Sequence, residues 1–479
     1  MGEELERAIF LIDFRHCSDF SKIRSLSIAE PSFLLLEFGN GQKRRYAPAR
    51  KNIKFLAVYE MFCVIFTKMK QKEDMMNAKM ILVVGTLDTK AAEFGMVRDM
   101  IVARGHGALL MDVGVGEPQI SADISAASVA EAGGSSLSAL RDAGDRGAAL
   151  TTMANGAQAL AIQAYAEGKF DGVISLGGSG GTSIATAVMR ALPVGVPKIM
   201  VSTMASGDTA PYVGVKDIAM MYSVVDVAGL NRISRKVFSN AVGAICGMVE
   251  QPLPDSQDKK IIAASMFGVT TPCVTEARKA LEDAGYEVLV FHTTGSGGRA
   301  MESLIKDGFV AGVADITTTE LCDELAGGVL SAGPDRLEAA AHAGIPQVVS
   351  LGALDMVNFG GVETVPEKFK QRTLHVHNPQ VTLMRTTPEE CAELGKIIAH
   401  KLNQSTAPVA LYIPLRGVSQ IDADGMPFHS PAADEALFTS LRKSVDSTKV
   451  EVVEMDSNIN DPEFAAAMST RLLRMLESS

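Results

Sequence analysis

Short apolar runs alternate with longer segments of helical spacing from residue 80 onward. Residues 80–84 form a continuous apolar run, as a buried parallel strand requires. A polar turn at 85–90 follows, then the helical spacing of 91–104, and then a second apolar run at 108–113. This succession predicts a βαβ unit with a right-handed crossover.

The same alternation continues along the chain. An Ala-rich segment at 146–167 predicts a long helix, and an apolar run at 173–176 leads through a glycine turn into another helix. Residues 251–258, rich in Pro, Gln and Asp, indicate a linker. Beyond it, the order and length of 260–298 echo those of 80–114. Further strands are predicted at 196–202, 310–316, 347–351 and 408–413.

We therefore predict an α/β protein of two Rossmann-like domains that face each other and have mainly parallel sheets. The first domain spans 79–250, a linker covers 251–259, and the second domain spans 260–479. Ligands of such sheets bind at the carboxyl ends of the strands. We expect the ligand between the two domains or beside them.

Residues 1–78 differ in composition, because they are net basic in a chain of formal net charge −11. We interpret them as an N-terminal extension of unknown role, or as the product of a start codon upstream of Met75, Met76 or Met80. The basic triplet at 43–45 suits a binding patch or a solvated turn. The apolar stretch at 55–66 is shorter than the roughly 20 residues that cross a bilayer, and it favours a buried strand or short helix.

Composition narrows the class of protein. A length of 479 residues with 47% hydrophobic content favours a soluble protein of two to three domains. The acidic balance argues against nucleic acid as the main partner. The six cysteines lack C-x-x-C spacing, so neither a zinc site nor a disulfide framework is predicted. We expect a cytoplasmic protein with no membrane partner.

The glycine turn at 177–181 (Gly-Gly-Ser-Gly-Gly) is the strongest candidate for a ligand site. It lies between a predicted strand and a helix N-terminus, where unpaired N–H groups and the helix dipole attract anions. It is not a Walker A loop, because no Lys follows its last glycine. We interpret it as a phosphate cradle with Thr182 as a possible donor. The alternative is tight packing between strand and helix.

Two further groups in the first domain could bind an anion. Thr86, Asp88, Thr89 and Lys90 follow the first strand. Asp88 could hold Mg²⁺ or a ribose hydroxyl and Lys90 a phosphate, although a helix cap with a solvated lysine explains them equally well. Arg146 begins a predicted helix, where a cation opposes the dipole. That position suggests an external anion as its partner.

The second domain has candidates of its own. In the turn at 295–299, Arg299 adds a guanidinium, which suits a small anion near Gly297, Gly298 and Arg299. Tight packing between strand and helix explains this turn equally well. The polar residues at 315–323 suit acid–base work or, with slight preference, helix capping by Thr with Glu.

Two metal patterns in the second domain are weak. His375 and His377 would share one face of an extended segment, but no third ligand can be assigned and a structural role is favoured. Asp422 and Asp424 begin like a calcium loop that lacks its closing Glu. No catalytic residue and no metal-ligating residue is assigned from the sequence.

Several stretches together resemble one family. Blocks of this length, in this order, resemble the Tm-1-like ATP-binding proteins, the N-terminal half of the tomato mosaic virus resistance protein and its bacterial relatives. The resemblance begins at about Met80 and continues to the C-terminus, and residues 1–78 have no counterpart in it. The stretches are VVGTLDTK (83–90), LGGSGGTS (176–183), STMASGD (202–208), MFGVTTPCV (266–274), FHTTGSGGRAMESL (291–304), DITTTEL (315–321), LGALDMVNFG (351–360) and LMRTTPEE (383–390).

The resemblance implies two Rossmann-like domains and ATP binding in the first. Val115 and its neighbours depart from the plant pattern. Carried over by position, the implied nucleotide contacts are Gly178, Ser179, Gly180, Gly181, Arg146, Val115 and Thr86.

These observations lead us to expect a cytoplasmic, homodimeric ATP-binding protein, with Mg²⁺ as a possible companion of the nucleotide. As an enzyme it would perform ATP-dependent phosphoryl transfer or activate a small carboxylate or sugar acid. Two alternatives stay open. One is a non-catalytic nucleotide-sensing or protein-interaction module, and the other is a sugar-acid metabolic enzyme for which ATP is incidental.

Overall fold

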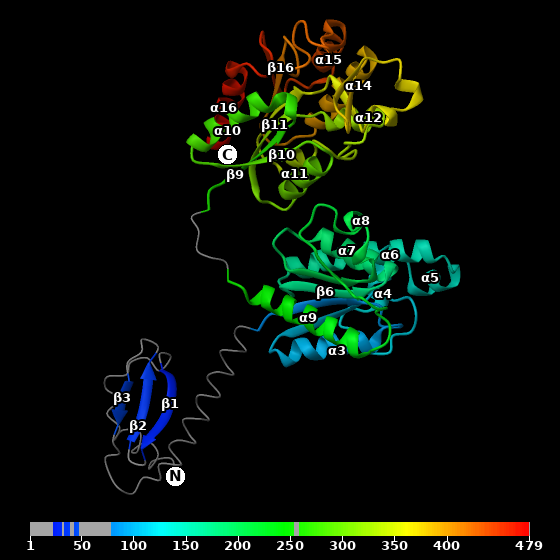
Figure 1. Cartoon of the computed structure of the whole chain (residues 1–479), viewed down its shortest axis with the longest axis vertical. Coiled ribbons are helices and arrows are strands. Elements are labelled where there is room, and N and C mark those ends of the chain that lie inside the picture. The colour runs from blue at the N-terminus through cyan, green and yellow to red at the C-terminus, as the bar shows by residue number, and fades with distance from the viewer. Residues whose placement is uncertain (1–22, 31–32, 39–42, 47–77, 253–257, 479) are drawn as a thin grey trace. The chain divides into compact units, whose positions relative to one another are not determined.

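The computed structural model describes residues 23–30, 33–38, 43–46, 78–252 and 258–478. The chain divides into two compact units, Met1–Ala78 and Lys79–Ser479. Their elements are labelled in Figure 1.

The N-terminal unit contains a three-stranded antiparallel sheet in the order β1-β2-β3. Its strands are β1 (Ile23–Glu30), β2 (Phe33–Phe38) and β3 (Lys43–Tyr46). The basic triplet at 43–45 lies in β3, so the interpretation of the triplet as a turn is wrong. The apolar stretch at 55–66 lies outside the described residues.

The first domain of the second unit is built on a five-stranded parallel sheet in the order β5-β4-β6-β7-β8. The strands predicted at 80–84, 108–113, 173–176 and 196–202 are all present, and β8 had not been predicted. The strands are β4 (Met80–Gly85), β5 (Gly107–Asp112), β6 (Gly172–Gly177), β7 (Lys198–Ser202) and β8 (Ala219–Tyr222).

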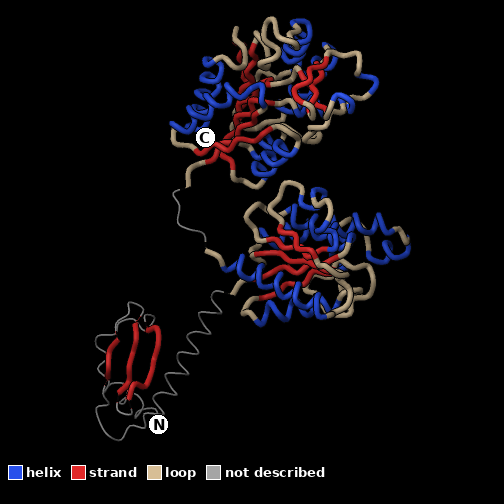
Figure 2. Tube along the Cα trace, viewed as in Figure 1, coloured by secondary structure: helices blue, strands red, loops and turns tan. Residues whose placement is uncertain are grey.

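Helices cover both faces of this sheet, as Figure 2 shows. Successive side chains of a strand point to opposite faces. Ile81 and Val83 pack with the helices at 91–103 and 232–250, whereas Leu82 and Val84 pack with those at 126–132, 146–166 and 179–191. The helices are α3 (Ala91–Ala103), α4 (Ala126–Ala132), α5 (Leu137–Ala143), α6 (Arg146–Ala166), α7 (Ser179–Ala191), η2 (Thr203–Ser206), α8 (Ala210–Val213) and α9 (Arg232–Glu250).

The strand order reverses at β4. From β4 the chain goes to β5 on one side and then returns to β6 on the other side, where Val84 lies beside Ser175. The loops that follow β4 and β6 therefore diverge to opposite faces of the sheet. Open α/β sheets bind ligands at this kind of reversal, outside the carboxyl ends of the strands.

The second domain has a six-stranded parallel sheet in the order β10-β9-β11-β12-β16-β17. Its strands are β9 (Ile261–Met266), β10 (Glu287–His292), β11 (Val310–Thr317), β12 (Gln347–Gly352), β16 (Val409–Pro414) and β17 (Val450–Met455). Its helices are η3 (Gly268–Thr270), α10 (Thr271–Asp283), α11 (Ser296–Lys306), α12 (Glu320–Ala326), α13 (Ala339–Ala343), α14 (Pro388–Leu402), α15 (Pro431–Ser444) and α16 (Pro462–Glu477). The two-domain α/β prediction is confirmed.

A small antiparallel sheet, which had not been predicted, lies between β12 and α14 in the chain. Its order is β13-β15-β14, with β13 (Met356–Phe359), β14 (Leu374–Asn378) and β15 (Val381–Arg385), and the short helices η4 (Val362–Thr364) and η5 (Glu367–Phe369) join its strands. His375 and His377 lie in β14. The described residues hold no cluster of three or more His, Cys, Asp or Glu that could bind a metal. Nor do they include a helix long and apolar enough to cross a membrane.

Candidate functional site

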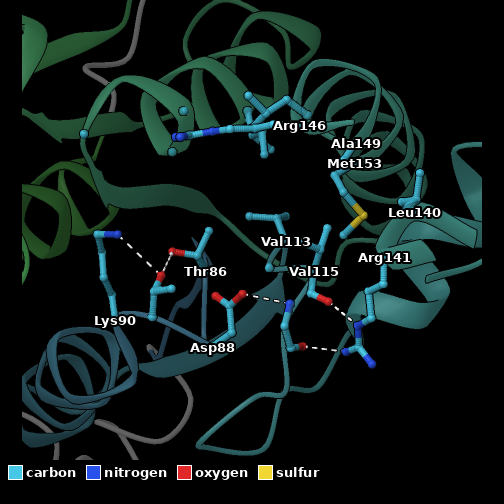
Figure 3. Close-up of a pocket in the computed structure, with 18 of the residues that line it drawn as sticks. Thr86, Asp88, Lys90, Val113, Val115, Leu140, Arg141, Arg146, Ala149 and Met153 are labelled. Atoms are coloured by element: carbon cyan, nitrogen blue, oxygen red, sulfur yellow. Dashed lines mark hydrogen bonds between the residues drawn. The ribbon is translucent and has the colours of Figure 1, made fainter. Parts of the chain in front are cut away.

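A cavity of about 810 Å³ opens at the carboxyl edge of the first sheet. This volume is within the roughly 300–1,000 Å³ typical of small-molecule sites. The lining comes from the exits of β4, β5 and β6 and from the starts of α6 and α7 (Figure 3). All seven positions that the family resemblance implied lie on this lining: Thr86, Val115, Arg146, Gly178, Ser179, Gly180 and Gly181.

The glycine turn leads from a buried strand into a helix that has no capping side chain. β6 is buried along its whole length, Gly178 is the N-cap of α7, and no side chain accepts a hydrogen bond at this helix start. The N–H of Thr182 donates to the carbonyl oxygen of Gly178 at 2.9 Å. The N–H groups before Thr182 lack an acceptor within the helix, as at any helix start. They are therefore available to a ligand in the cavity.

Packing accounts for one glycine of the turn. A Cβ on Gly177 would lie 3.0 Å from the backbone of Gly181 and Thr182, so strand and helix approach closely there. A Cβ on Gly180 would first meet Leu150 at 3.4 Å. For Gly178 and Gly181, the nearest atoms would be 3.8 Å and 3.7 Å away, and neither they nor Gly180 have a positive φ. Three glycines of the turn thus leave room at the cavity.

Thr182 is not the donor that we predicted. Its side chain is fully buried, and its hydroxyl pairs with the hydroxyl of Ser202 at 2.6 Å. It joins α7 to β7 beneath the turn and does not line the cavity. Ser179, the first residue of α7, does line it.

Arg146 is a cation with no acidic partner among the described residues. It is the first residue of α6, whose N-cap Asp145 accepts hydrogen bonds from the N–H groups of Gly147 and Ala148. The Nη2 atom of Arg146 lies 3.7 Å from the position that a Cβ of Gly180 would take. In Figure 3 the side chain runs along one wall of the cavity. A guanidinium beside an uncapped helix start is well suited to an anion.

The exit of β4 forms the opposite wall at the same end of the cavity. Lys90 is the N-cap of α3, and no side chain caps this helix. The interpretation of the loop after β4 as a helix cap is therefore wrong. The Oδ2 atom of Asp88 accepts from the N–H of Gly116 at 2.8 Å, and its buried Oδ1 has no partner among the described residues. Asp88 therefore fixes the loop after β5 and keeps one oxygen unused.

Arg141, which sequence analysis missed, secures the loop after β5. From the last turn of α5, it donates hydrogen bonds to the carbonyl oxygens of Val115 and Gly116 and forms an ion pair with Glu117. The signal was weak, since a basic residue at a helix C-terminus is common for dipole reasons alone. Asp112 supports the loop from the strand side through the N–H groups of Leu87 and Gly114, and burial raises the pKa of Asp112.

The other end of the cavity is apolar. Leu140, Ala149, Met153 and Ile184 line it, and each has at most 9% of its surface exposed. Figure 3 shows Leu140, Ala149 and Met153 together, away from Lys90. The cavity thus has a cationic end with two helix starts and an apolar end within the core.

Comparison with known proteins identifies the family. The model of the Uncharacterised protein family (UPF0261) N-terminal domain matches residues 79–254, and that of its C-terminal domain matches 259–476. The chain belongs to the UPF0261 family.

The chain is similar to proteins of two bacteria and of a plant. A UPF0261 protein of Clostridium tetani is 55% identical over 404 residues, which cover 84% of this chain and 100% of that protein. The UPF0261 protein RA0729 of Rhizobium meliloti is 50% identical over 81% of this chain and 97% of its own. The ToMV resistance protein Tm-1(GCR237) of Solanum lycopersicum is 44% identical over 70% of this chain but only 45% of its own length. The predicted resemblance to the Tm-1-like family is confirmed.

The second glycine turn of the protein is occupied by the carboxylate of Glu320. The N–H groups of Gly295 and Gly298 donate to Oε1 of Glu320 at 2.8 Å and 3.0 Å, and Glu320 is fully buried. Arg299 is exposed and donates to the carbonyl oxygen of Ser331 at 3.3 Å. A small anion near Gly297, Gly298 and Arg299 stays a prediction, and at these amides it would compete with Glu320.

Glu320 belongs to a buried network around Arg336. This arginine has no exposed surface and contacts the carboxylates of Asp315, Glu320 and Glu302 at 2.5–3.2 Å. Thr319 precedes α12 without a side-chain cap, so the predicted capping by Thr with Glu is wrong. Acid–base work is untested, and the geometry gives Asp315 and Glu320 a structural ion-pair role.

A second buried arginine, Arg385, holds a cluster of aspartates. Its Nη2 atom contacts Asp422 at 3.1 Å and Asp434 at 2.6 Å, and its Nε donates to the carbonyl oxygen of Phe428. Asp355 is buried nearby, bonded to Ser419. Burial raises the pKa of Asp422 to about 8 and that of Asp355 to about 6, and it raises the pKa of Asp434 as well.

These raised pKa values predict that the second domain becomes less stable as the pH rises from 6 to 8.5. An aspartate in the unfolded chain has a pKa of about 3.9. Between about pH 4 and pH 8, these aspartates therefore bind more protons in the folded protein than in the unfolded chain. The contribution of these aspartates to the free energy of unfolding is then most favourable at the acid side of this window and falls as the pH rises. We expect a loss on the order of 2 kcal/mol between pH 6 and pH 8.5, measured by urea denaturation. Asp422→Asn should flatten this dependence, and an equally steep slope in that variant would contradict the assignment.

Proposed function

We propose that this protein binds ATP in the cavity of its first domain. One observation carries the proposal. The seven positions implied by the family resemblance, from four separate segments of the sequence, line a single cavity of suitable volume. Its two ends differ in polarity in the way that the two ends of a nucleotide do.

The polar end suits a phosphate chain. Six described helices of the first domain are longer than one turn. A side chain caps the N-terminus of four of them, α4, α5, α6 and α9. No side chain caps the N-terminus of α3 or α7. The starts of α3 and α7 both line the cavity. Unsatisfied N–H groups and positive helix ends at these starts favour phosphate oxygens. Arg146 adds a full positive charge beside Gly180.

The apolar end suits a purine. Leu140 and Met153 offer the apolar contact that a flat base buries on binding. The loop that contains Val115 borders this end of the cavity. Arg141 donates a hydrogen bond to the carbonyl oxygen of Val115. We place the base between this loop and α6.

Mg²⁺ would accompany the triphosphate at Asp88. Protein-bound Mg²⁺ commonly uses one or two carboxylates together with substrate phosphates and water. Three carboxylates line the cavity, and those of Asp145 and Glu117 are engaged by the start of α6 and by Arg141. Asp88 has an oxygen without a partner among the described residues, so it is the carboxylate best placed for the ion.

Arg146→Ala tests the phosphate end of this proposal. Loss of a charge-assisted contact should weaken ATP binding by on the order of tenfold or more. A ligand held only by the folded state raises the unfolding temperature. The stabilisation of wild type by ATP in a thermal-shift assay should therefore shrink in the variant.

A matched control is Arg98→Ala, because Arg98 lies on α3 in an exposed pair with Asp99. It should retain the wild-type shift. An Arg146→Ala protein with an unchanged ATP shift would contradict the assignment of Arg146 to the phosphate chain.

A further inference from the structure

Two walls face each other at the polar end of the cavity. One wall is the start of α7 with Arg146, and the other is the start of α3 with Thr86 and Lys90. β4 and β6 are adjacent, and neighbouring strands lie about 4.8 Å apart. Because α3 and α7 pack on opposite faces of the sheet, their N-termini flank the crevice from both sides.

Lys90 supplies the second wall with a charge that the protein itself does not neutralise. Its ammonium is 3.5 Å from the hydroxyl of Thr89 and has no acidic partner among the described residues. The side chain is partly buried. Figure 3 shows Lys90 across the cavity from Arg146. Two such cations on opposite walls suit an anion longer than one phosphate.

We propose that Lys90 and the start of α3 hold the terminal phosphate of a nucleoside triphosphate. The glycine turn and Arg146 hold the phosphates closer to the ribose. Lys90 is then a specificity-determining residue that selects ligands by the number of their phosphates. This inference rests on the proposed ATP site.

The test compares four probes by isothermal titration: ATP, ADP, AMP and inorganic tripolyphosphate. Lys90→Met keeps the apolar stem of the side chain and removes its charge. We expect its affinity for ATP and for tripolyphosphate to fall on the order of 10- to 100-fold, and its affinity for AMP to change by less than about threefold. Lys90→Arg, which retains the charge, should recover part of the preference for ATP over AMP.

Lys79→Met is the matched control, because Lys79 pairs with Asp171 at the amino edge of the same sheet. It should behave as wild type with all four probes. Circular dichroism and the unfolding temperature without ligand establish that each variant is folded.

The outcomes separate this inference from the proposed function. If Lys90→Met lowers the affinities for ATP and AMP equally, or changes neither affinity, Lys90 does not hold the terminal phosphate, while the proposed ATP site stands. If wild type binds tripolyphosphate through Lys90 but binds no nucleotide, the phosphate subsite stands and ATP is the wrong ligand. If wild type binds none of the four probes, both proposals fail.

Discussion

Gly180→Val is expected to reduce ATP affinity by more than about 100-fold while the protein remains folded. A Cβ at this position meets Leu150 and Arg146 only at ordinary contact distances, 3.4 Å and 3.7 Å. The two γ-carbons of valine would extend beyond that point, over the N–H groups at the start of α7. They would exclude a phosphate from the cradle and displace Arg146. Calorimetric titration with ATP measures the affinity, and urea denaturation measures the stability.

Two neighbouring substitutions make this result specific. Gly180→Ala adds only the tolerated Cβ and should weaken ATP binding less than valine does. Gly177→Val should destabilise the fold instead, because its Cβ would already lie 3.0 Å from backbone atoms of Gly181 and Thr182. Wild-type ATP affinity in Gly180→Val would show that the turn does not hold the phosphates.

Arg336→Met should strongly destabilise the second domain. It removes the buried cation that contacts Asp315, Glu320 and Glu302, and these buried carboxylates then lose their counter-charge. Breaking a buried ion pair from one side typically costs about 3–5 kcal/mol. We expect a decrease of that size in the free energy of unfolding, measured by urea denaturation at pH 7.

The control is Arg278→Met, which removes an exposed arginine from an i,i+4 pair with Glu282 on α10. Exposed pairs contribute about 0–1 kcal/mol, so this variant should be nearly as stable as wild type. Equal stability losses in the two variants would mean that the Arg336 network does not hold the second domain together.

Much of the architecture could be predicted because buried parallel strands have continuous apolar sequences. The apolar runs at 80–84 and 173–176 correspond to β4 and β6. The linker composition after residue 250 indicated the boundary between two similar halves of the sequence. The small sheet of β13, β14 and β15 was missed. Its strands are short, and the segment between β13 and β14 has no regular apolar period.

Some residues of the first-domain cavity were predictable from local patterns, whereas Val115 was implied only by the family resemblance. The glycine turn follows a strand directly, which is a local signal, and Arg146 stands at a helix start, where it opposes the dipole. Arg141 was missed because it acts across 26 positions of the chain, on the carbonyl oxygen of Val115. Contacts of that separation depend on the tertiary fold and leave no local pattern.

The two glycine turns look alike in sequence but differ in position. The turn at 177–181 follows β6, where the chain reverses direction across the sheet, whereas the turn at 295–298 follows β10 at the sheet edge. Glu320 lies far along the chain from Gly295 and could not be paired with it from the sequence. An internal carboxylate at such a turn satisfies the same amides that a ligand would.

Direct titration of the wild-type protein with ATP in the presence of Mg²⁺ tests the central claim. We predict saturable binding of one ATP per chain, with AMP bound more weakly and with heats that vanish in Gly180→Val. No detectable heat with wild type, or the same affinity in wild type and Gly180→Val, would contradict a nucleotide site at the glycine turn of the first domain.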